Sequence, residues 1–281
     1  MAKKEKKPEY VASPINTPML NYRVYYMSKQ EKLITFLAAF LVGGAIGLIF
    51  YGGQFLDALG APTKATLICN YVIFLLAGLI AVKVFFPMRT EQLKAARKKA
   101  LSSQFRSFLD SLSVAMSSGM NTYDSMKSAL EDLTLEYGKN AYIVNEVSNM
   151  IACSKHNFAL DETMKEFGER SEIEDIVNFS IVFSISYRAG GDTKDIVRRS
   201  NQIISDKLEI SEHIKTVITS NKSQFNIMLF IPVVIVLMLR NMSSDFAKGF
   251  STLTGVAAIT IACGMFVAAY FLAQKIMDVE G

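Results

Sequence analysis

Four carboxylates that could do acid–base chemistry or bind a metal lie close together in the second half of the 281-residue sequence: Glu169, Glu172, Glu174 and Asp175. Their position at the start of a predicted helix favours another interpretation, because the helix dipole stabilises negative side chains there. We therefore interpret them as a charged helix surface rather than as a catalytic or metal site.

The other residue types that carry chemistry are too scattered to form a site. The two histidines, His156 and His213, have no acidic or cysteine partner at the spacing of a metal site. The three cysteines are too far apart for a zinc motif, and no serine has the glycine-flanked elbow of a hydrolase. A phosphate-binding GxxxxGK[ST] loop is also absent from the sequence. We expect no enzymatic activity, no metal and no cofactor.

Two segments repeat one pattern at a constant offset: SSGMNTYDSM (117–126) and RAGGDTKDIV (188–197). In each, a glycine suited to a helix end is followed by Asn121 or Asp192, which suits the N-cap of a new helix. Asp124 and Asp195 fall at the third helical position, where a negative charge meets the helix dipole. The pattern predicts two helix–glycine–cap–helix joints. We expect their polar faces to dock a partner, through Asn121, Asp124, Asp192, Asp195, Arg198 and Arg199.

The helices that must position these joints are bounded by glycines. Residues 88–224 contain no proline, and between residues 100 and 226 glycine occurs only at 119, 138, 168, 190 and 191. Cutting there predicts helices near 91–118, 121–136, 139–155, 160–168, 172–189 and 192–225. Helical spacing predicts one apolar stripe of Phe105, Phe108, Leu109, Leu112 and Met116, and another of Ile196, Ile203, Leu208, Ile214 and Val217. The segment 88–224 is expected to form a bundle of about six helices.

The remaining apolar residues are gathered in blocks, whereas a soluble domain would distribute them periodically. Runs without charge occur at 33–56, 65–82, 223–239 and 249–274. They predict membrane spans at 33–56, 65–86, 225–242 and 250–274. The third run is the weakest, and a buried helix of a soluble core stays open for it. The fold class we expect is all-α: a polytopic membrane protein with four spans and the helical bundle between the second and third. Gly43, Gly44 and Gly47 would allow close helix contact, within the chain or with another subunit.

Basic residues orient this arrangement, because positive charge gathers on the cytoplasmic side of a membrane. They predict that both termini and the segment 88–224 are cytoplasmic, including a polar tail at 275–281. The tail 1–32 is expected to remain solvated, since it has few large apolar groups to bury. The basic residues after the second run, Lys94, Arg97, Lys98 and Lys99, are interpreted as an anchor to anionic lipid rather than as a nucleic-acid site.

Two stretches resemble a known family. FRSFLDSLSVAMSSGMNTYDSMKSALEDL is similar to the opening of a type II secretion system F domain, and the segment from YRAGGDTKDIVRRS to IPVVIVLML is similar to its close, with Pro232 early in the span. The resemblance covers roughly Ser103 to Leu239, and the expected topology is similar to that of single-domain members from tight-adherence (Tad/Flp) pilus assembly systems.

The resemblance implies a platform protein of the cytoplasmic membrane. Such a protein meets a hexameric secretion ATPase on its cytoplasmic side and helps to lift pilin subunits out of the bilayer. Better-known family members carry two such domains in one chain, so a single domain implies pairing with a second copy or with a paralogue. The missing phosphate loop agrees, because nucleotide energy would then come from the partner.

One alternative remains open from the sequence: a subunit of an ion-driven motor of the flagellar-stator or ExbB-like kind. Those proteins also place a helical block between their second and third spans. The charge-free runs hold no carboxylate for an ion relay, but in that class the carboxylate belongs to a partner chain. The repeated glycine–cap joints favour the secretion platform, because the motor fold gives no reason for them.

Overall fold

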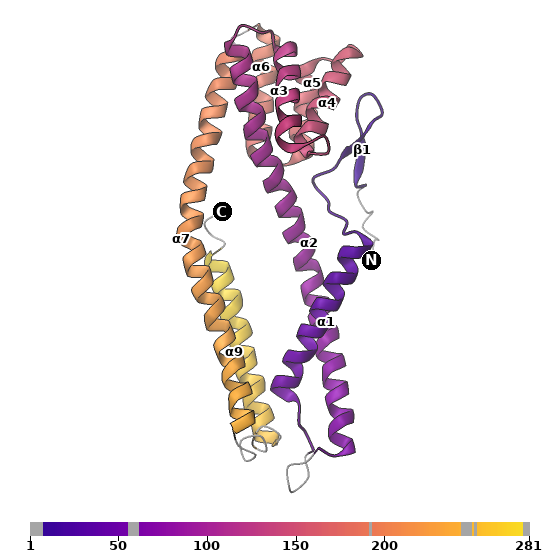
Figure 1. Cartoon of the computed structure of the whole chain (residues 1–281), viewed down its shortest axis with the longest axis vertical. Coiled ribbons are helices and arrows are strands. Elements are labelled where there is room, and N and C mark those ends of the chain that lie inside the picture. The colour runs from indigo at the N-terminus through magenta and orange to yellow at the C-terminus, as the bar shows by residue number, and fades with distance from the viewer. Residues whose placement is uncertain (1–7, 56–61, 191–192, 243–248, 250–251, 278–281) are drawn as a thin grey trace. The chain divides into compact units, whose positions relative to one another are not determined.

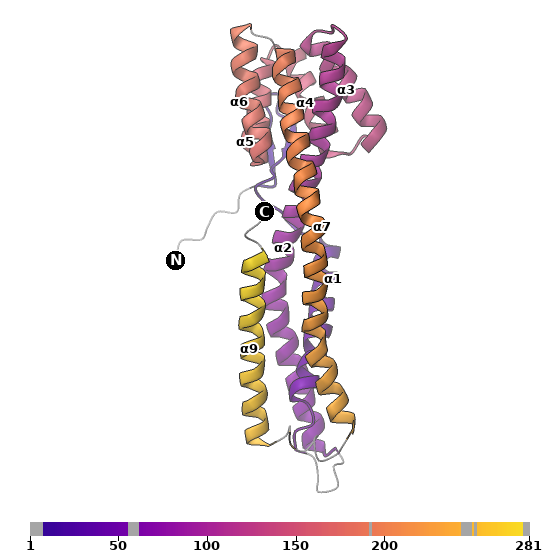
Figure 2. The ribbon, with the colours of Figure 1, turned by 90° about the vertical axis from the view of Figure 1, so that its left-hand side faces the viewer.

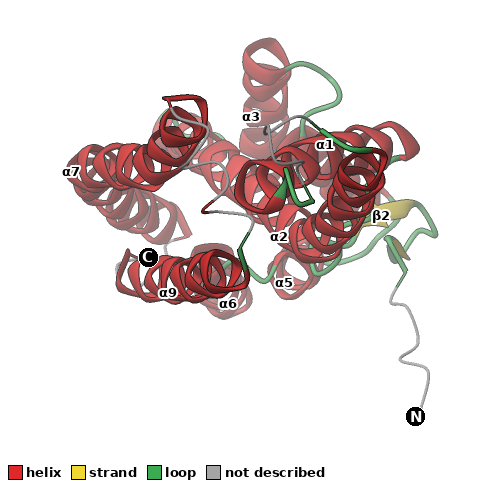
Figure 3. Ribbon diagram, turned by 90° about the horizontal axis from the view of Figure 1, so that it is seen from below, coloured by secondary structure: helices red, strands yellow, loops and turns green. Residues whose placement is uncertain are grey.

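The computed structural model describes residues 8–55, 62–190, 193–242, 249 and 252–277. Helices make up most of this described chain, and one two-stranded antiparallel sheet lies near the N-terminus (Figure 3). The chain divides into two units: a helical domain, Met1–Tyr26 with Thr90–Glu212, and an apolar unit, Met27–Arg89 with His213–Gly281. The all-α class expected from the sequence is therefore confirmed.

In the apolar unit, helix α1 spans Lys29–Tyr51 and begins with a capping box. The Ser28 hydroxyl accepts from the backbone N–H of Glu31, and the Glu31 carboxylate accepts from that of Ser28. Gly52 closes the helix, so α1 begins and ends earlier than the span predicted at 33–56.

The glycines of α1 hold it close to α2 (Lys64–Ser117). A Cβ atom on Gly43 would lie 2.2 Å from the Cβ of Ala81, and one on Gly47 would lie 2.4 Å from that of Ala77. Contacts this short are impossible, so only glycine allows the two helices to approach this closely. The close contact predicted for these glycines is confirmed, and it lies within the chain.

Three helices in the described chain are long and apolar enough to cross a membrane: α1, α2 and the stretch Thr254–Leu272 of α9 (Leu253–Met277). The third predicted run lies in α7 (Thr193–Met242), where the apolar stretch Phe230–Leu239 is shorter. α2 continues through the boundary at which the sequence predicts a new segment, and α7 runs without a break from the helical domain into its apolar stretch. Pro87 lies inside α2 and Pro232 inside α7, so neither proline ends its helix.

The helical domain contains α3 (Thr122–Tyr137), α4 (Tyr142–Lys155), α5 (Leu160–Ser171) and α6 (Glu174–Ala189), together with the adjoining parts of α2 and α7 (Figure 1). Its core holds the whole predicted stripe of α2, which packs against Met126, Val147, Phe167 and Phe183. The stripe predicted for α7 is confirmed at Leu208, which packs against the core, and is wrong by one residue earlier in the helix: Ile203 is 66% exposed, whereas Val197 and Ile204 are buried. Ile214 and Val217 lie outside the residues whose side chains are described.

Three of the glycines chosen as helix ends do end helices. Gly119, Gly138 and Gly190 have φ angles of 93°, 80° and 65°, a region that residues with a Cβ rarely adopt. Gly168 was expected to end a helix at 160–168, and that prediction is wrong. α5 continues past it to Ser171 and is closed by Glu172 in the left-handed conformation. α4 also begins later than predicted, at Tyr142 rather than 139.

Gly168 instead allows α5 and α6 to pack side by side (Figure 2). A Cβ atom there would lie 2.3 Å from the Oγ and 2.9 Å from the Cβ of Ser180. We expect Gly168→Ala to destabilise the helical domain by about 1–3 kcal/mol through overpacking. Thermal unfolding of the full chain in detergent measures this. The double variant Gly168→Ala/Ser180→Gly should recover most of the loss, and a single variant as stable as the wild type would contradict this packing role.

The N-terminal segment departs most from expectation. The sequence predicts a solvated tail at 1–32, but β1 (Tyr10–Ala12) and β2 (Pro18–Leu20) pair antiparallel, with Val11 opposite Met19. Tyr22 is only 1% exposed and belongs to the core of the helical domain. We call residues 8–26 the N-terminal strap. The prediction fails because the strap obtains its apolar contacts from distant helices, which composition alone does not reveal.

Candidate functional site

The first joint has the geometry that the sequence predicts. The side-chain oxygen of Asn121 accepts from the backbone N–H of Asp124 at 2.9 Å, which caps α3. The amide nitrogen of Asn121 donates to the Asp124 carboxylate at 2.8 Å. Both side chains form hydrogen bonds within the joint and remain exposed to solvent, as does the neighbouring Met120. The joint therefore presents a polar corner with one apolar side chain.

The second joint presents an ion-paired group. Gly190 ends α6, and Asp192, the predicted cap, lies outside the described residues. In the first turns of α7, Asp195 pairs with Arg198 at 3.0 Å and with Arg199 at 2.7 Å. The two arginine side chains are 67% and 72% exposed, so these pairs contribute little stability and leave the guanidinium groups accessible to a partner.

Both joints lie at one end of the helical domain. Asn201 donates to Asp110 at 2.6 Å, and Arg106 donates to Ser205 at 3.1 Å, so α2 and α7 run antiparallel past each other. Continuing that alignment brings the end of α2 level with the first turn of α7 (Figure 1). The structure thus places the described candidates Asn121, Asp124, Asp195, Arg198 and Arg199 at one end, which we call the joint end.

An ion pair between α5 and α6 lies beside the second joint. Asp161 is buried and accepts from Arg188 and, at 3.2 Å, from Ser184. Burial acts to raise the pKa of Asp161, but the hydrogen bonds from Arg188 and Ser184 outweigh it and hold the pKa below its usual value. The pair therefore joins the two helices while Asp161 is ionised.

This pair predicts a loss of stability in acid. The pKa of Asp161 is lower in the folded than in the unfolded chain, so its contribution is present above the ordinary pKa of about 4 and is lost as the pH falls through the folded value. We expect Asp161→Asn to lower the unfolding temperature by about 2–4 °C at pH 7 and to remove this part of the acid sensitivity. Thermal unfolding in detergent between pH 7 and 3 measures both. Glu162→Gln, which changes an exposed partner of the same arginine, is the matched control; equal shifts in both variants would contradict the assignment.

The basic residues that were interpreted as a lipid anchor lie on α2 and take part in contacts within the protein. Lys98 pairs with Glu172 at 3.3 Å, and the Arg97 guanidinium lies 4.3 Å above the ring of Tyr25. Lys94 lies 4.0 Å from Glu91, and Lys99 is exposed to solvent. Lipid contact by these residues stays a prediction.

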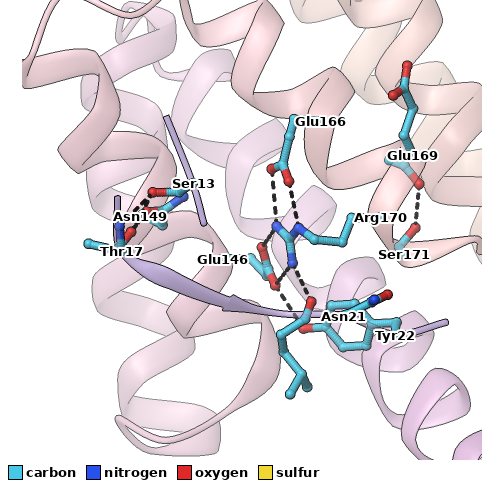
Figure 4. A network of polar contacts seen from close by, with 12 residues as sticks. Ser13, Thr17, Asn21, Tyr22, Glu146, Asn149, Glu166, Glu169, Arg170 and Ser171 are labelled. Carbon is cyan, nitrogen blue, oxygen red and sulfur yellow. Dashed lines mark hydrogen bonds and ion pairs between the residues drawn. The ribbon is translucent and has the colours of Figure 1, made fainter. Parts of the chain in front are cut away.

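A buried polar network fastens the strap to α4 and α5, and sequence reasoning missed it (Figure 4). Arg170 donates to both oxygens of Glu146, at 2.8 and 2.6 Å, and to Glu166 at 2.7 Å. The Tyr22 hydroxyl donates to Glu146 at 2.9 Å, and Arg170 also reaches the backbone carbonyl of Leu20 at 2.7 Å.

The polar groups of this network hold the fold together, because Arg170 and Tyr22 keep the protonation states that their hydrogen bonds require. Burial alone would lower the pKa of Arg170, but hydrogen bonds with the carboxylates of Glu146 and Glu166 raise it above its usual range. Burial also raises the pKa of the Tyr22 hydroxyl, so it keeps the proton that it donates to Glu146. A positional signal existed in the sequence: Glu146 lies in the apolar stripe of Ile143, Val147 and Met150, where an unpaired charge would be costly.

Two of the four neighbouring carboxylates, Glu172 and Asp175, form surface ion pairs. Glu172 pairs with Arg23 and Lys98, and Asp175 pairs with Lys207 at 2.8 Å. Glu174 and Asp175 lie in the first turn of α6. Within the described residues, no group of three or more His, Cys, Asp or Glu side chains could hold a metal ion.

A comparison with family models matches residues 108–239 to type II secretion system (T2SS) protein F. The matched segment begins in α2, contains both joints and α3–α6, and ends in the apolar part of α7. The strap lies outside it. No curated protein and no solved structure matches the chain. The match supports the type II secretion system protein F family for the domain formed by residues 108–239.

Proposed function

We propose that this protein is a platform of the cytoplasmic membrane in a type II secretion or type IV pilus-type assembly machine, and specifically of the tight-adherence (Tad/Flp) kind. The observation that carries the proposal is the F-domain match at 108–239, in a chain with three helices that could span a membrane. The single domain and its position between apolar segments support the Tad/Flp assignment.

In this proposal the chain crosses the membrane four times and both termini are cytoplasmic. α7 supplies the remaining span through its C-terminal part, near 225–242. The continuity of α7 from Thr193 to Met242 supports this. The apolar stretch Phe230–Leu239 is short, but the helical residues on either side of it can supply the remaining length needed to cross the membrane. The basic residues around 94–99 support a cytoplasmic position for the helical domain.

The platform acts through partners rather than through chemistry of its own. A hexameric secretion ATPase docks at the joint end, where Arg198 and Arg199 are accessible and Asp124 adds a charge of opposite sign. Exposed arginines are common energetic centres of protein interfaces. A second copy of the chain or a paralogue completes the platform, and pilin subunits are lifted from the bilayer beside it.

Deletion of the gene in its native cells tests the function. The proposal expects surface filaments to disappear and their subunits to accumulate in the membrane, with recovery when the gene is restored. Unchanged filaments would contradict the proposal. Loss of swimming or of an ion-driven uptake, with filaments intact, would instead favour the motor alternative.

A further inference from the structure

The helical domain contains a pocket of about 540 Å³ between the N-terminal strap and α4. Strap residues such as Tyr10, Thr17 and Met19 form one wall, and Tyr142, Asn145 and Asn149 of α4 form the other. Its volume lies within the range of pockets that bind small molecules. Neither the family match, which begins at residue 108, nor the proposed function assigns a role to it.

Arg97 is the basic residue of this pocket, and its bonding is incomplete. Its side chain is only 12% exposed. Among the described residues, the buried Nε and Nη1 atoms have no hydrogen-bond partner. The nearest carboxylate, that of Glu9, lies 4.0 Å from Nη2, and the Tyr25 ring covers one face of the guanidinium. A buried guanidinium with unpaired N–H groups is costly, and an oxyanion offers the acceptors that it lacks.

The rest of the pocket supplies groups that suit a polar ring. Asn140 and Asn145 form no side-chain hydrogen bonds within the described chain, and Asn149 uses only its oxygen, which accepts from Thr17 at 2.7 Å. Amide side chains that are free to donate and accept can pair with the edge of a heterocycle. The rings of Tyr10 and Tyr142 provide flat apolar surfaces on which such a ring can stack.

We propose that this pocket binds a small phosphate-bearing ligand of nucleoside monophosphate size. Arg97 contacts the phosphate, and the asparagine amides and tyrosine rings hold the base. The other buried charge in the wall, the Glu146 carboxylate, already accepts hydrogen bonds from Arg170 and Tyr22, so it does not compete with the ligand for Arg97. Because the walls come from both the strap and α4, a bound ligand fastens the strap to the helical domain.

Calorimetric titration of the full chain in detergent micelles tests the site, with AMP, GMP, inorganic phosphate and adenosine as probes. We expect at least one nucleotide to bind with a Kd of roughly 10 µM. Inorganic phosphate should bind at least roughly tenfold more weakly, and adenosine, which has no phosphate, should not bind measurably.

Three variants separate binding from folding. Arg97→Gln should weaken nucleotide binding at least roughly tenfold, because a charge-assisted contact is lost. Asn145→Ala changes an exposed side chain that the fold does not use, and should weaken binding about fivefold. Arg106→Gln, on the same helix but bonded to Ser205 outside the pocket, should bind like the wild type.

Three results would overturn the proposal. The first is that neither nucleotide binds the wild-type chain, and the second is that adenosine binds as tightly as AMP. The third is that Asn145→Ala and a folded Arg97→Gln both retain full affinity. None of these results bears on the platform function, because the filament assay reads that function separately.

Discussion

Replacing Arg170 with methionine is expected to lower the free energy needed to open α4 and α5 by about 3–5 kcal/mol. Glu146 would then have to remain buried without its counter-charge or take up a proton, and the Leu20 carbonyl would lose its donor. Because the same network holds Tyr22, the strap should loosen together with the two helices. Amide hydrogen exchange of the full chain in detergent, read by mass spectrometry, measures the effect in each segment.

Two further variants separate the buried pair from a general loss of charge. Glu146→Leu/Arg170→Met removes both charges and should restore much of the protection, since apolar replacement of a buried ion pair is often neutral. Arg106→Met removes an arginine bonded to Ser205 at the domain surface and should change protection by no more than about 0.5 kcal/mol. If the single Arg170 variant exchanged like the wild type, the strap would not depend on this network.

Reversing Arg198 and Arg199 to glutamate is expected to reduce recovery of the secretion ATPase with the tagged protein by roughly tenfold or more. Both arginines pair with Asp195, so the reversed side chains would also gather three negative charges at the first turns of α7. The stability of the domain should change little, because these side chains are mostly exposed. The measurement is quantitative mass spectrometry of the co-purified chains.

The matched control reverses two exposed lysines away from both joints, Lys139 and Lys165, and so makes the same change in net charge. It should leave ATPase recovery within about twofold of wild type. Surface charges far from the interface affect association only through the electrostatic potential of the whole protein. Equal losses in the two double variants would show that net charge, rather than the joint end, controls the association.

Features that depend only on local conformation could be predicted from the sequence. A glycine followed by a capping residue needs only a few neighbours, and Gly119 with Asn121 has the predicted geometry. Gly168 is followed two positions later by Arg170 rather than by a capping residue, and it serves the packing of α5 against α6, which depends on Ser180 in another helix. The first part of the α7 stripe is displaced because Ile196 and Val197, like Ile203 and Ile204, are adjacent apolar residues, and spacing alone does not decide which of them faces the core.

The strap and its polar network could not be predicted in this way, because they depend on contacts between residues far apart in the sequence. Tyr22 and Glu146 are joined by a hydrogen bond across more than a hundred residues, and neither has a neighbour in the sequence that signals the other. Opposite charges in two apolar stripes, Glu146 in α4 and Arg170 in α5, were the available hint. Such a pair indicates a buried salt bridge, but it does not indicate that an N-terminal tyrosine will complete it.

The most direct test of the platform account is a mild-detergent affinity purification of the tagged protein from its native cells, with every co-purifying chain identified by mass spectrometry. The account expects a secretion ATPase, together with a second F-domain protein or an excess of the chain itself. A single-span partner with an aspartate in its membrane segment, and no ATPase, would contradict it and would indicate an ion-driven motor.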